Sequence, residues 1–444
     1  MLETNDCGIP FRARERSLLL WTIPALLPLM VAALGFHPSG AFPPVRSFFV
    51  PAGCLLASLV GHGILVLARS RSDTTLLPAW AVIVGIGWSF QYRLDPSFHW
   101  DYLSKSTLAW VLSPLILVIN AILFRGSMQR WIQRMHWFWI IASFGVCLAV
   151  LATGVSYRGA VFGPGKTTPT EWIKPFLILG LSGLLCRYGS AMARGRSLRT
   201  ESSRRAHIMI IGAWLPTAAI LILLKDLGMI AATGILLVAL LTITTGRIRY
   251  LVTGLVCAVA GGWFFQHFAG KGRVRFAAWL HPFDHPDAGG FQTIRSLFAL
   301  FNGEFFGQGI GNGFPGTVPL VETDFVYAGF AEEVGWFGSV LFLLLAWHFV
   351  QQGFHHANRA NGIYAALVAM GASTVWAVQL FLHVGGVIKL IPMTGVPFPG
   401  LSSGGTAVLV FATLAGWISA VGDSGTDAPA EPRQDPVKRR NQRT

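Results

Sequence analysis

The stretch DLGMIAATGILLVALLTITT, residues 226–245, decides the fold. Apart from Asp226 at its start it carries no charge, and about 20 such residues are what an α-helix needs to cross a bilayer core of roughly 30 Å. Comparable stretches recur along a chain in which 53% of 444 residues are hydrophobic and only 12% are charged. The sequence therefore predicts an all-α polytopic membrane protein.

Hydropathy also predicts how the chain is divided. About twelve segments have the length and composition of transmembrane helices. The expected spans are residues 17–37, 46–68, 74–92, 106–124, 135–154, 172–192, 208–224, 226–245, 248–268, 326–350, 361–385 and 403–422. One long loop, residues 269–325, separates the ninth span from the tenth, and the polar tail at 423–444 is expected to be disordered.

Basic residues predict the orientation, because Lys and Arg in short loops favour the cytoplasmic side of a membrane. With residues 1–16 and the C-terminal tail both cytoplasmic, most of the 34 basic residues lie in cytoplasmic segments, including the arginine-rich stretch 187–205. The loop 269–325 is then exterior. The formal net charge of +14 is explained by topology and by attraction to anionic lipid headgroups. No motif for binding nucleic acid is present.

The exterior loop holds an unusual concentration of polar side chains. Its segment HPFDHPDAGGFQ, residues 281–292, places two aspartates and two histidines among prolines and glycines. The following FQTIRSLFALFN, residues 291–302, has apolar residues at helical spacing, which predicts a short helix in or on the outer leaflet. Loops longer than about 15 residues are usually functional or disordered, and these apolar residues argue against disorder.

Three motifs in the last third of the chain resemble the SEDS family (FtsW, RodA, SpoVE) of integral-membrane peptidoglycan glycosyltransferases. They are GGFQTIRSLFALFNGEFFGQGIGNG, VETDFVYAGFAEEVGWFG and GGVIKLIPMTGVPFPGLSSGG, in the family's order and at its spacing. Weaker similarities, among them PTEWIKPF and LLKDLGMI, extend the resemblance over residues 74–422. The resemblance implies a ten-helix core, to which residues 17–73 add two N-terminal helices.

The resemblance also implies an activity and a setting. Family members polymerise lipid II into glycan strands by inverting transfer, with release of undecaprenyl diphosphate, during bacterial cell division or elongation. The expected location is the bacterial cytoplasmic membrane. The expected partners are lipid II, a class B penicillin-binding transpeptidase and other division or elongation proteins.

The catalytic loop departs from the family pattern of Asp-Pro, two residues, Asp-Pro, in which the second aspartate is regarded as the catalytic base. Here His281 and His285 occupy the two aspartate positions, while Asp284 and Asp287 flank the second. A sugar hydroxyl requires a positioned base to accept its proton. The candidate bases are, in order, Asp284, His285 and Asp287, against the structural alternative that the aspartates form Asx turns.

A diphosphate leaving group requires cations or a metal ion to neutralise its developing charge. The candidate substrate- and diphosphate-binding residues are Glu171, Lys174, Arg273, Arg275, Arg295, Asp324, Lys389 and Ser402. In the family, the acid and lysine of the PTEWIK motif line the central cavity; the alternative is a solvated ion pair at the membrane interface.

Cofactor expectations follow from the same residues. A loosely held Mg²⁺ or Mn²⁺ at the diphosphate is expected, whereas prolines disrupt the helical spacing that a zinc site at His281, Asp284 and His285 would use. No nucleotide is expected, because GQGIGNG lacks the lysine of a P-loop.

Two carboxylates within the tenth span need an explanation. If the chain is one helix from Asp324, Glu332 and Glu333 lie about 12 Å deeper along it. Alternatively, residues 315–333 are re-entrant. In both arrangements these carboxylates should face protein or water, because exposure to lipid is costly.

Two other functions remain open from the sequence. Twelve spans with an arginine-rich loop after the sixth resemble a six-plus-six transporter, including a flippase for lipid-linked precursors. The two halves do not resemble each other, however, and the polar residues gather in one exterior loop. The histidines in the catalytic loop allow a third possibility, a SEDS-like division scaffold without catalytic activity.

Overall fold

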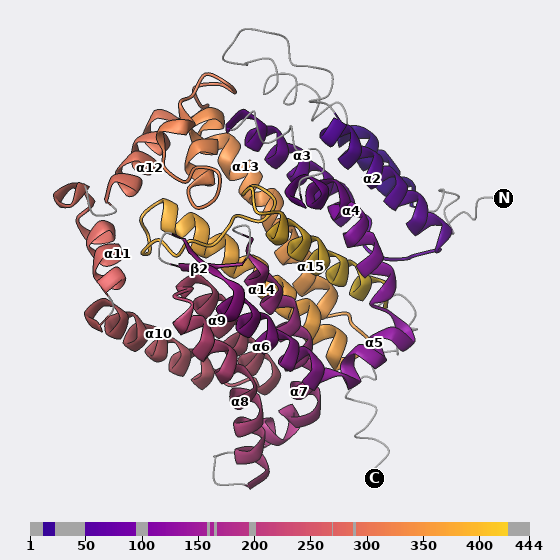
Figure 1. Ribbon diagram of the computed structural model, residues 1–444. Coiled ribbons are helices and arrows are strands. Elements are labelled where there is room, and N and C mark those ends of the chain that lie inside the picture. Colours follow the sequence, from indigo (N-terminus) through magenta and orange to yellow (C-terminus); the bar gives the residue numbers. More distant parts are fainter. Residues whose placement is uncertain are drawn as a thin grey trace, which may run out of the picture.

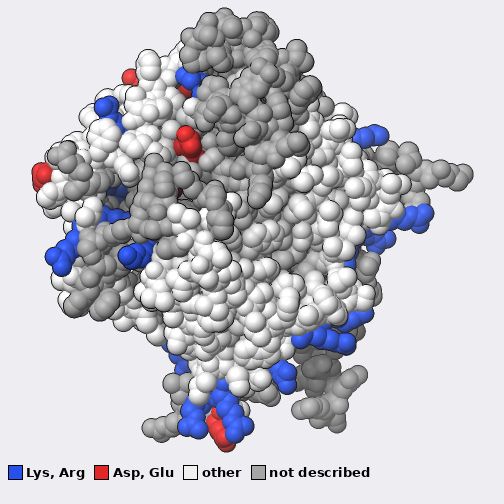
Figure 2. Space-filling view, viewed as in Figure 1, with Lys and Arg blue, Asp and Glu red and all other residues white. Residues whose placement is uncertain are grey.

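The computed structural model describes residues 12–22, 49–94, 105–157, 160–163, 167–194, 201–268, 270–286 and 290–424 (Figure 1). Most of the long helices run side by side as one bundle. We call the end that carries residues 69–75, 124–135 and 246–248 the basic end, and the end that carries 154–172, 224–226 and 388–404 the loop end. On the face shown in Figure 2, Lys and Arg form patches along the lower edge, over α5 and α8.

Every expected span from 46–68 onward coincides with an α-helix. The long helices are α2 (Phe49–Leu67), α3 (Leu76–Leu94), α4 (Lys105–Leu123), α6 (His136–Thr153), α7 (Ile173–Arg194), α8 (Glu201–Leu223), α9 (Leu227–Thr245), α10 (Arg249–Phe268), α13 (Val326–Ala357), α14 (Ile363–Val387) and α15 (Gly405–Ser424). The first expected span, 17–37, lies mostly outside the described residues.

By length and composition, eight helices of the described residues could cross a membrane, or nine if the bent pair Thr107–Leu123 and Gly126–Arg134 is one span. The all-α membrane fold is confirmed, and about twelve spans remain compatible with it.

Several short elements accompany the long helices, and all of them except the helix at 291–302 were not expected. A short antiparallel hairpin, β1 (Val155–Tyr157) and β2 (Ala160–Phe162), pairs Val155 with Phe162 at the loop end. The helix α5 (Gly126–Arg134) follows α4 at an angle of 90°. In the long loop, α11 (Gly270–Leu280), the 3-10 turn η5 (Pro282–Asp284), α12 (Phe291–Asn302) and the turn η7 (Pro315–Thr317) succeed one another. The helix predicted at 291–302 is confirmed by α12.

The core of the bundle is built around α14 and α15. Trp376 of α14 stacks on Phe349 with ring centroids 4.5 Å apart, and its ring meets the edge of Phe411 at 4.8 Å. Trp80 of α3 approaches both Phe349 and Trp376 edge-on. Gly416 lets α15 lie against α4, since a Cβ there would be 2.5 Å from the Leu117 carbonyl oxygen. This packing buries α14 from several sides and holds the polar side chains near its end in place.

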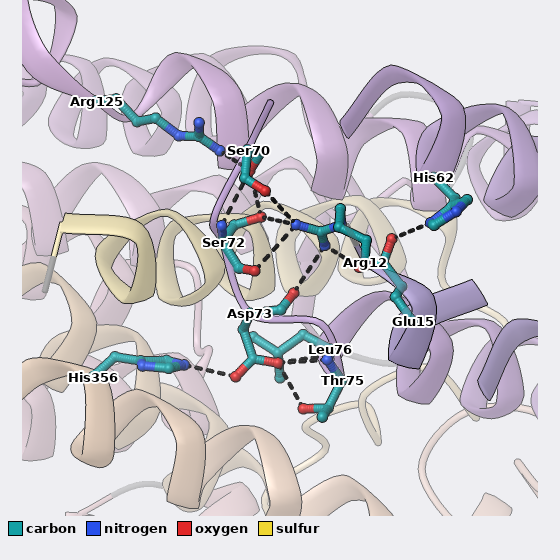
Figure 3. Close-up of polar contacts among 10 residues, drawn as sticks. All are labelled: Arg12, Glu15, His62, Ser70, Ser72, Asp73, Thr75, Leu76, Arg125 and His356. Carbon is teal, nitrogen blue, oxygen red and sulfur yellow. Dashed lines mark hydrogen bonds and ion pairs between the residues drawn. The ribbon is translucent and has the colours of Figure 1, made fainter. Parts of the chain in front are cut away.

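A buried polar network attaches the N-terminal residues to the basic end (Figure 3). Arg12 donates to the Ser70 carbonyl at 2.8 Å and pairs with Glu15, which lies 2.6 Å from His62. Asp73 accepts hydrogen bonds from the Thr75 backbone N–H at 2.6 Å and from His356 at 2.8 Å. The network therefore joins residues 12–15 to α2, to the α2–α3 connection and to the end of α13.

Candidate active site

The PTEWIK motif supplies a buried ion pair at the loop end. Residues Pro169–Trp172 form the turn η4, which leads directly into α7. The Lys174 ammonium donates to Glu171 at 2.6 Å and to the side-chain carbonyl of Gln379 at 2.9 Å, and Lys174 is completely buried. Gln379 in turn donates to the Pro397 carbonyl at 2.8 Å. The pair is thus enclosed by protein and is not the solvated interface pair considered as its alternative.

Asp226 adds a third charged group to this pair. It caps the N-terminus of α9, where its carboxylate accepts from the Met229 N–H at 3.0 Å. Burial, with a contribution from the nearby Glu171 carboxylate, raises the pKa of Asp226, while the Met229 N–H, Lys174 and Arg275 act in the opposite direction. The structure therefore brings Glu171, Lys174, Asp226 and Arg275 into one electrostatic group, which we call the Lys174 cluster.

The helix α11 is held to the segment after α14. Arg275 donates a long hydrogen bond of 3.4 Å to the Met393 carbonyl, and Trp279 donates to the Lys389 carbonyl at 3.1 Å. The Lys389 ammonium reaches the Leu280 carbonyl at 3.3 Å. Lys389 therefore lies where α11 ends, just before the loop that carries the candidate bases.

Ser402 and Asp324 lie where two of the family-like motifs meet. The buried Ser402 hydroxyl donates to the Thr323 carbonyl at 2.8 Å and accepts from the Phe398 N–H at 2.8 Å. Asp324, half-buried, has a carboxylate oxygen 3.7 Å from where a Cβ on Gly395 would be. Ser402 thus orders the 388–404 segment against residues 322–324, with its hydrogen-bonding capacity used inside the protein.

The loop that carries the candidate bases is exposed. Asp284 is at the end of η5 and its side chain is 72% exposed; His281 approaches it at 3.8 Å, and His285 is also exposed. Gly290 closes this turn, because a Cβ there would lie 2.4 Å from the Pro282 and His285 carbonyl oxygens. Asp287 lies outside the described residues. Asp284 and His285 are therefore open to a substrate, in contrast to the buried Lys174 cluster.

The other two predicted cations lie on the exposed surface of the long loop. Arg273 donates to the His267 carbonyl at 3.0 Å, and Arg295 is positioned over the Phe291 ring, 5.3 Å from its centroid. Both side chains are exposed. Of the predicted cations, only Lys174 and Arg275 belong to the Lys174 cluster.

The carboxylates of the tenth span face protein, as expected. The α13 helix is interrupted at Gly335, whose φ of 74° and ψ of 179° are not helical. At the break, the Gln308 and Gly309 N–H groups donate to the Glu332 and Glu333 carbonyls at 2.9 and 3.0 Å. The Glu333 carboxylate is paired with Arg93 at 3.4 Å. The segment before Gly335 is therefore a short helix held to the long loop, and α13 is not continuous through Gly335.

Comparison with known proteins assigns the chain to a family. The family model for FtsW, RodA and SpoVE, described as a cell cycle protein, matches residues 74–426. The chain belongs to this SEDS family. The peptidoglycan glycosyltransferase RodA of Mycobacterium tuberculosis is 30% identical to this SEDS protein over 380 residues, covering 80% of each chain. The RodA of Mycobacterium leprae is 30% identical over 419 residues, covering 89% of this chain and 87% of its own length.

Solved structures share the fold of this SEDS protein. A chain from a peptidoglycan synthase complex, studied for its coordination of polymerization and crosslinking, is similar with a TM-score of 0.64 and 21% identity. The rod shape determining protein RodA of Thermus thermophilus is similar with a TM-score of 0.56 and 21% identity. In both cases 81% of this chain and 99% of the other are covered.

Several polar residues of this SEDS protein were missed at the sequence level. Gln379 connects Lys174 to the 388–404 segment, and His383 donates from Nδ1 to the Val396 carbonyl, 2.8 Å away. The other ring nitrogen of His383 is buried with no partner in the described part of the chain. The sequence did contain a signal for Gln379 and His383. Two polar residues four positions apart in an apolar span lie on one face of the helix, and such a face is usually functional.

Metal-binding groups do not gather in the described residues. No three His, Cys, Asp or Glu side chains there are arranged to hold a metal ion. On the exposed turn around η5, the possible metal donors are the Asp284 carboxylate and the imidazoles of His281 and His285. One carboxylate, completed by phosphate oxygens and water, is a typical Mg²⁺ environment in phosphate-binding sites.

Proposed function

We propose that this SEDS protein is a peptidoglycan glycosyltransferase that polymerises lipid II by inverting transfer and releases undecaprenyl diphosphate. The observation that carries the proposal is the convergence of three family motifs and the PTEWIK turn at the loop end. There Gln379 connects Lys174 with Pro397, and Gln91 donates to the Glu322 and Leu401 carbonyls at 3.0 and 2.8 Å. Its relatives over most of their length are named peptidoglycan glycosyltransferases.

The proposed orientation has the loop end outside the cell and both termini in the cytoplasm of a bacterium. The arginines of the α4–α5 and α9–α10 connections and of the first turn of α8 then lie inside, as the distribution of basic residues favours. Lipid II would be polymerised at the outer face of the cytoplasmic membrane, where the loop end lies.

The cations divide into two groups with different roles. Arg273, Arg295 and Lys389 are accessible at the loop end and would attract the diphosphate first. Arg275, half-buried, belongs to the Lys174 cluster and follows Arg273 on the same helix, α11. Lys174, paired with Glu171, would then supply a fixed positive charge that stabilises the negative charge developing as the diphosphate leaves, because a preorganised buried cation needs no rearrangement.

The base is proposed to be Asp284, followed by His285 and Asp287. The 4-hydroxyl of one sugar attacks the anomeric carbon of the other, and its proton passes to the base. The exposed Asp284 carboxylate becomes shielded from water only when the bound glycan covers the turn, and the His281 imidazole lies close enough to orient it.

A loosely held Mg²⁺ or Mn²⁺ would neutralise the diphosphate, with Asp284 as the carboxylate available to it among the described residues.

The proposed partner is a class B penicillin-binding transpeptidase within the division or elongation machinery. The supporting observation is that one solved relative belongs to a peptidoglycan synthase complex that couples polymerization with crosslinking. Glycan strands made at the loop end would be substrates for a transpeptidase on the same face of the membrane.

The decisive experiment is polymerisation of lipid II by the purified protein in liposomes, with and without the transpeptidase and divalent cations. Glycan strands are the expected product. Translocation of lipid II without polymer would instead indicate the flippase, and absence of both activities in every condition would indicate the scaffold.

A further inference from the structure

A basic cavity of about 400 Å³ opens at the basic end, between α5 and α7. Its lining includes Arg130, Arg134 and Arg187 together with Gln133 and His136, and contains no acidic residue. This cavity is at the opposite end of α7 from Lys174, and nothing in the proposed glycosyl transfer uses it.

The close packing of α7 shapes this cavity. A Cβ on Gly183 would lie 2.5 Å from the His136 Cβ, so glycine is needed for α7 to approach the α5–α6 junction. Arg187 follows Gly183 by about one helical turn and so faces the same junction. His136 has one ring nitrogen 3.1 Å from the Gln133 carbonyl oxygen, and its other ring nitrogen is buried with no partner in the described part of the chain.

Among the described residues, the three arginines differ from their neighbours in having no carboxylate partner. Arg125 pairs with Asp423 at 2.7 Å, and Arg205 pairs with Glu201. Within the described residues, Arg130, Arg134 and Arg187 take part in no ion pair with a carboxylate. Three like charges around one cavity repel each other unless an anion lies between them, and guanidinium groups bind phosphate in a bidentate manner.

The helix α5 indicates where that anion comes from. It turns 90° from α4, so it runs along the membrane surface if α4 crosses the membrane. None of its residues is buried, and its apolar side chains Met128 and Trp131 are 42% and 53% exposed. An apolar face beside an arginine-bearing face is typical of a helix that lies in the lipid headgroup region.

We infer that this cavity binds the phosphate of an anionic phospholipid headgroup in the leaflet at the basic end. Arg130 and Arg134 would hold the phosphate from α5 and Arg187 from α7, with Met128 and Trp131 among the adjoining acyl chains. The bound lipid would join α5 to α7 through charge, where the described part of the chain offers no carboxylate. The inference does not depend on the glycosyltransferase proposal.

The test compares lipid retention by two charge-matched variants. The full-length protein is reconstituted in vesicles of equal phosphatidylglycerol and phosphatidylcholine, extracted gently and analysed by native mass spectrometry. The double variant Arg130→Gln/Arg134→Gln removes two cavity charges. The control Arg204→Gln/Arg249→Gln removes two exposed charges from the same end. Arg187→Gln gives a second, independent cavity variant if the double variant does not fold.

Wild type and the control are expected to retain phosphatidylglycerol in preference to phosphatidylcholine. Both cavity variants are expected to bind it at least about tenfold more weakly, the loss that one charge-assisted hydrogen bond accounts for. Equal retention by cavity and control variants would overturn the inference in favour of diffuse attraction. If inorganic phosphate raises the unfolding temperature of the protein as much as a short-chain phosphatidylglycerol does, the cavity is a site for a free anion and the inference is overturned. Equal retention of phosphatidylcholine and phosphatidylglycerol would exclude recognition of the headgroup.

Discussion

The two buried polar regions of this SEDS protein use similar residues in opposite ways. At the basic end, Asp73 is supplied with hydrogen bonds from Thr75 and His356, which outweigh the effect of burial and hold its pKa below the ordinary value (Figure 3). At the loop end, burial prevails over the nearby cations and raises the pKa of Asp226. A buried carboxylate that accepts several hydrogen bonds stabilises the fold, whereas a buried carboxylate with too few hydrogen-bond donors is characteristic of functional sites.

The largest effect is expected in the exposed catalytic loop. Asp284→Ala should lower lipid II polymerisation by about 10²–10⁴-fold, the usual contribution of a general base, while thermal unfolding stays unchanged because the side chain is exposed. His281→Ala is the neighbouring control and should have a smaller effect.

His285→Ala and Asp287→Ala complete this test of the base. If all three alanine variants polymerise at the wild-type rate, the loop is not the catalytic centre. If wild type is inactive and His285→Asp gains activity, the protein is a scaffold that lost its base.

The next largest effect concerns the Lys174 cluster. Lys174→Met should lower polymerisation about a hundredfold, as expected for removing one preorganised charge from a transition state. It should also destabilise the protein by about 3–5 kcal/mol, because Glu171 is left as an unpaired buried charge.

The double variant Glu171→Gln/Lys174→Met separates these two effects. Its thermal unfolding should return toward that of wild type, while polymerisation stays low. Recovery of both quantities would show that the Lys174 cluster is structural, like the network at the basic end.

A smaller effect is expected at the basic end. Asp73→Ala should lower the free energy of unfolding by about 2 kcal/mol through lost hydrogen bonds to a charged group, with the polymerisation rate per folded molecule preserved. Because the pKa of Asp73 is lowered in the folded state, its stabilisation is complete above the pKa of an unfolded aspartate and is lost as the pH falls through the acidic range.

Thermal unfolding of wild type and Asp73→Ala as a function of pH measures this contribution. The two curves should converge at acidic pH. A constant difference at all pH values would mean that the charge of Asp73 contributes nothing to stability.

The smallest effect has the opposite sign. Since the pKa of Asp226 is raised in the folded state, ionising it costs stability as the pH rises above the range of an unfolded aspartate. Asp226→Asn should therefore raise the unfolding temperature slightly at neutral pH, because asparagine preserves the N-cap of α9. If Asp226→Asn instead lowers the unfolding temperature, Asp226 stabilises the fold as Asp73 does, and the two buried polar regions do not differ.

The sequence alone was sufficient for most of the fold. Each span from 46–68 onward was predicted because the preference of about 20 apolar residues for a bilayer is a local property. A glycine-rich stretch such as GQGIGNG is typical of tight turns, and its Gly307, Gly309 and Gly311 all have positive φ. The short hairpin β1–β2 and the helix α5 were missed, because short elements at a membrane surface leave only a weak pattern in hydropathy.

For the site, the sequence determined which charged residues lie near the loop end, and tertiary structure decided what they do there. Lys174 and Gln379 are 205 positions apart, and only the packing of α7 against α14 makes them partners. Likewise, composition could not show that Glu171 is buried while Asp284 is exposed. Hydropathy and charge placement act residue by residue along the chain, whereas burial and pairing depend on which helices pack together, so these were decided by the three-dimensional structure alone.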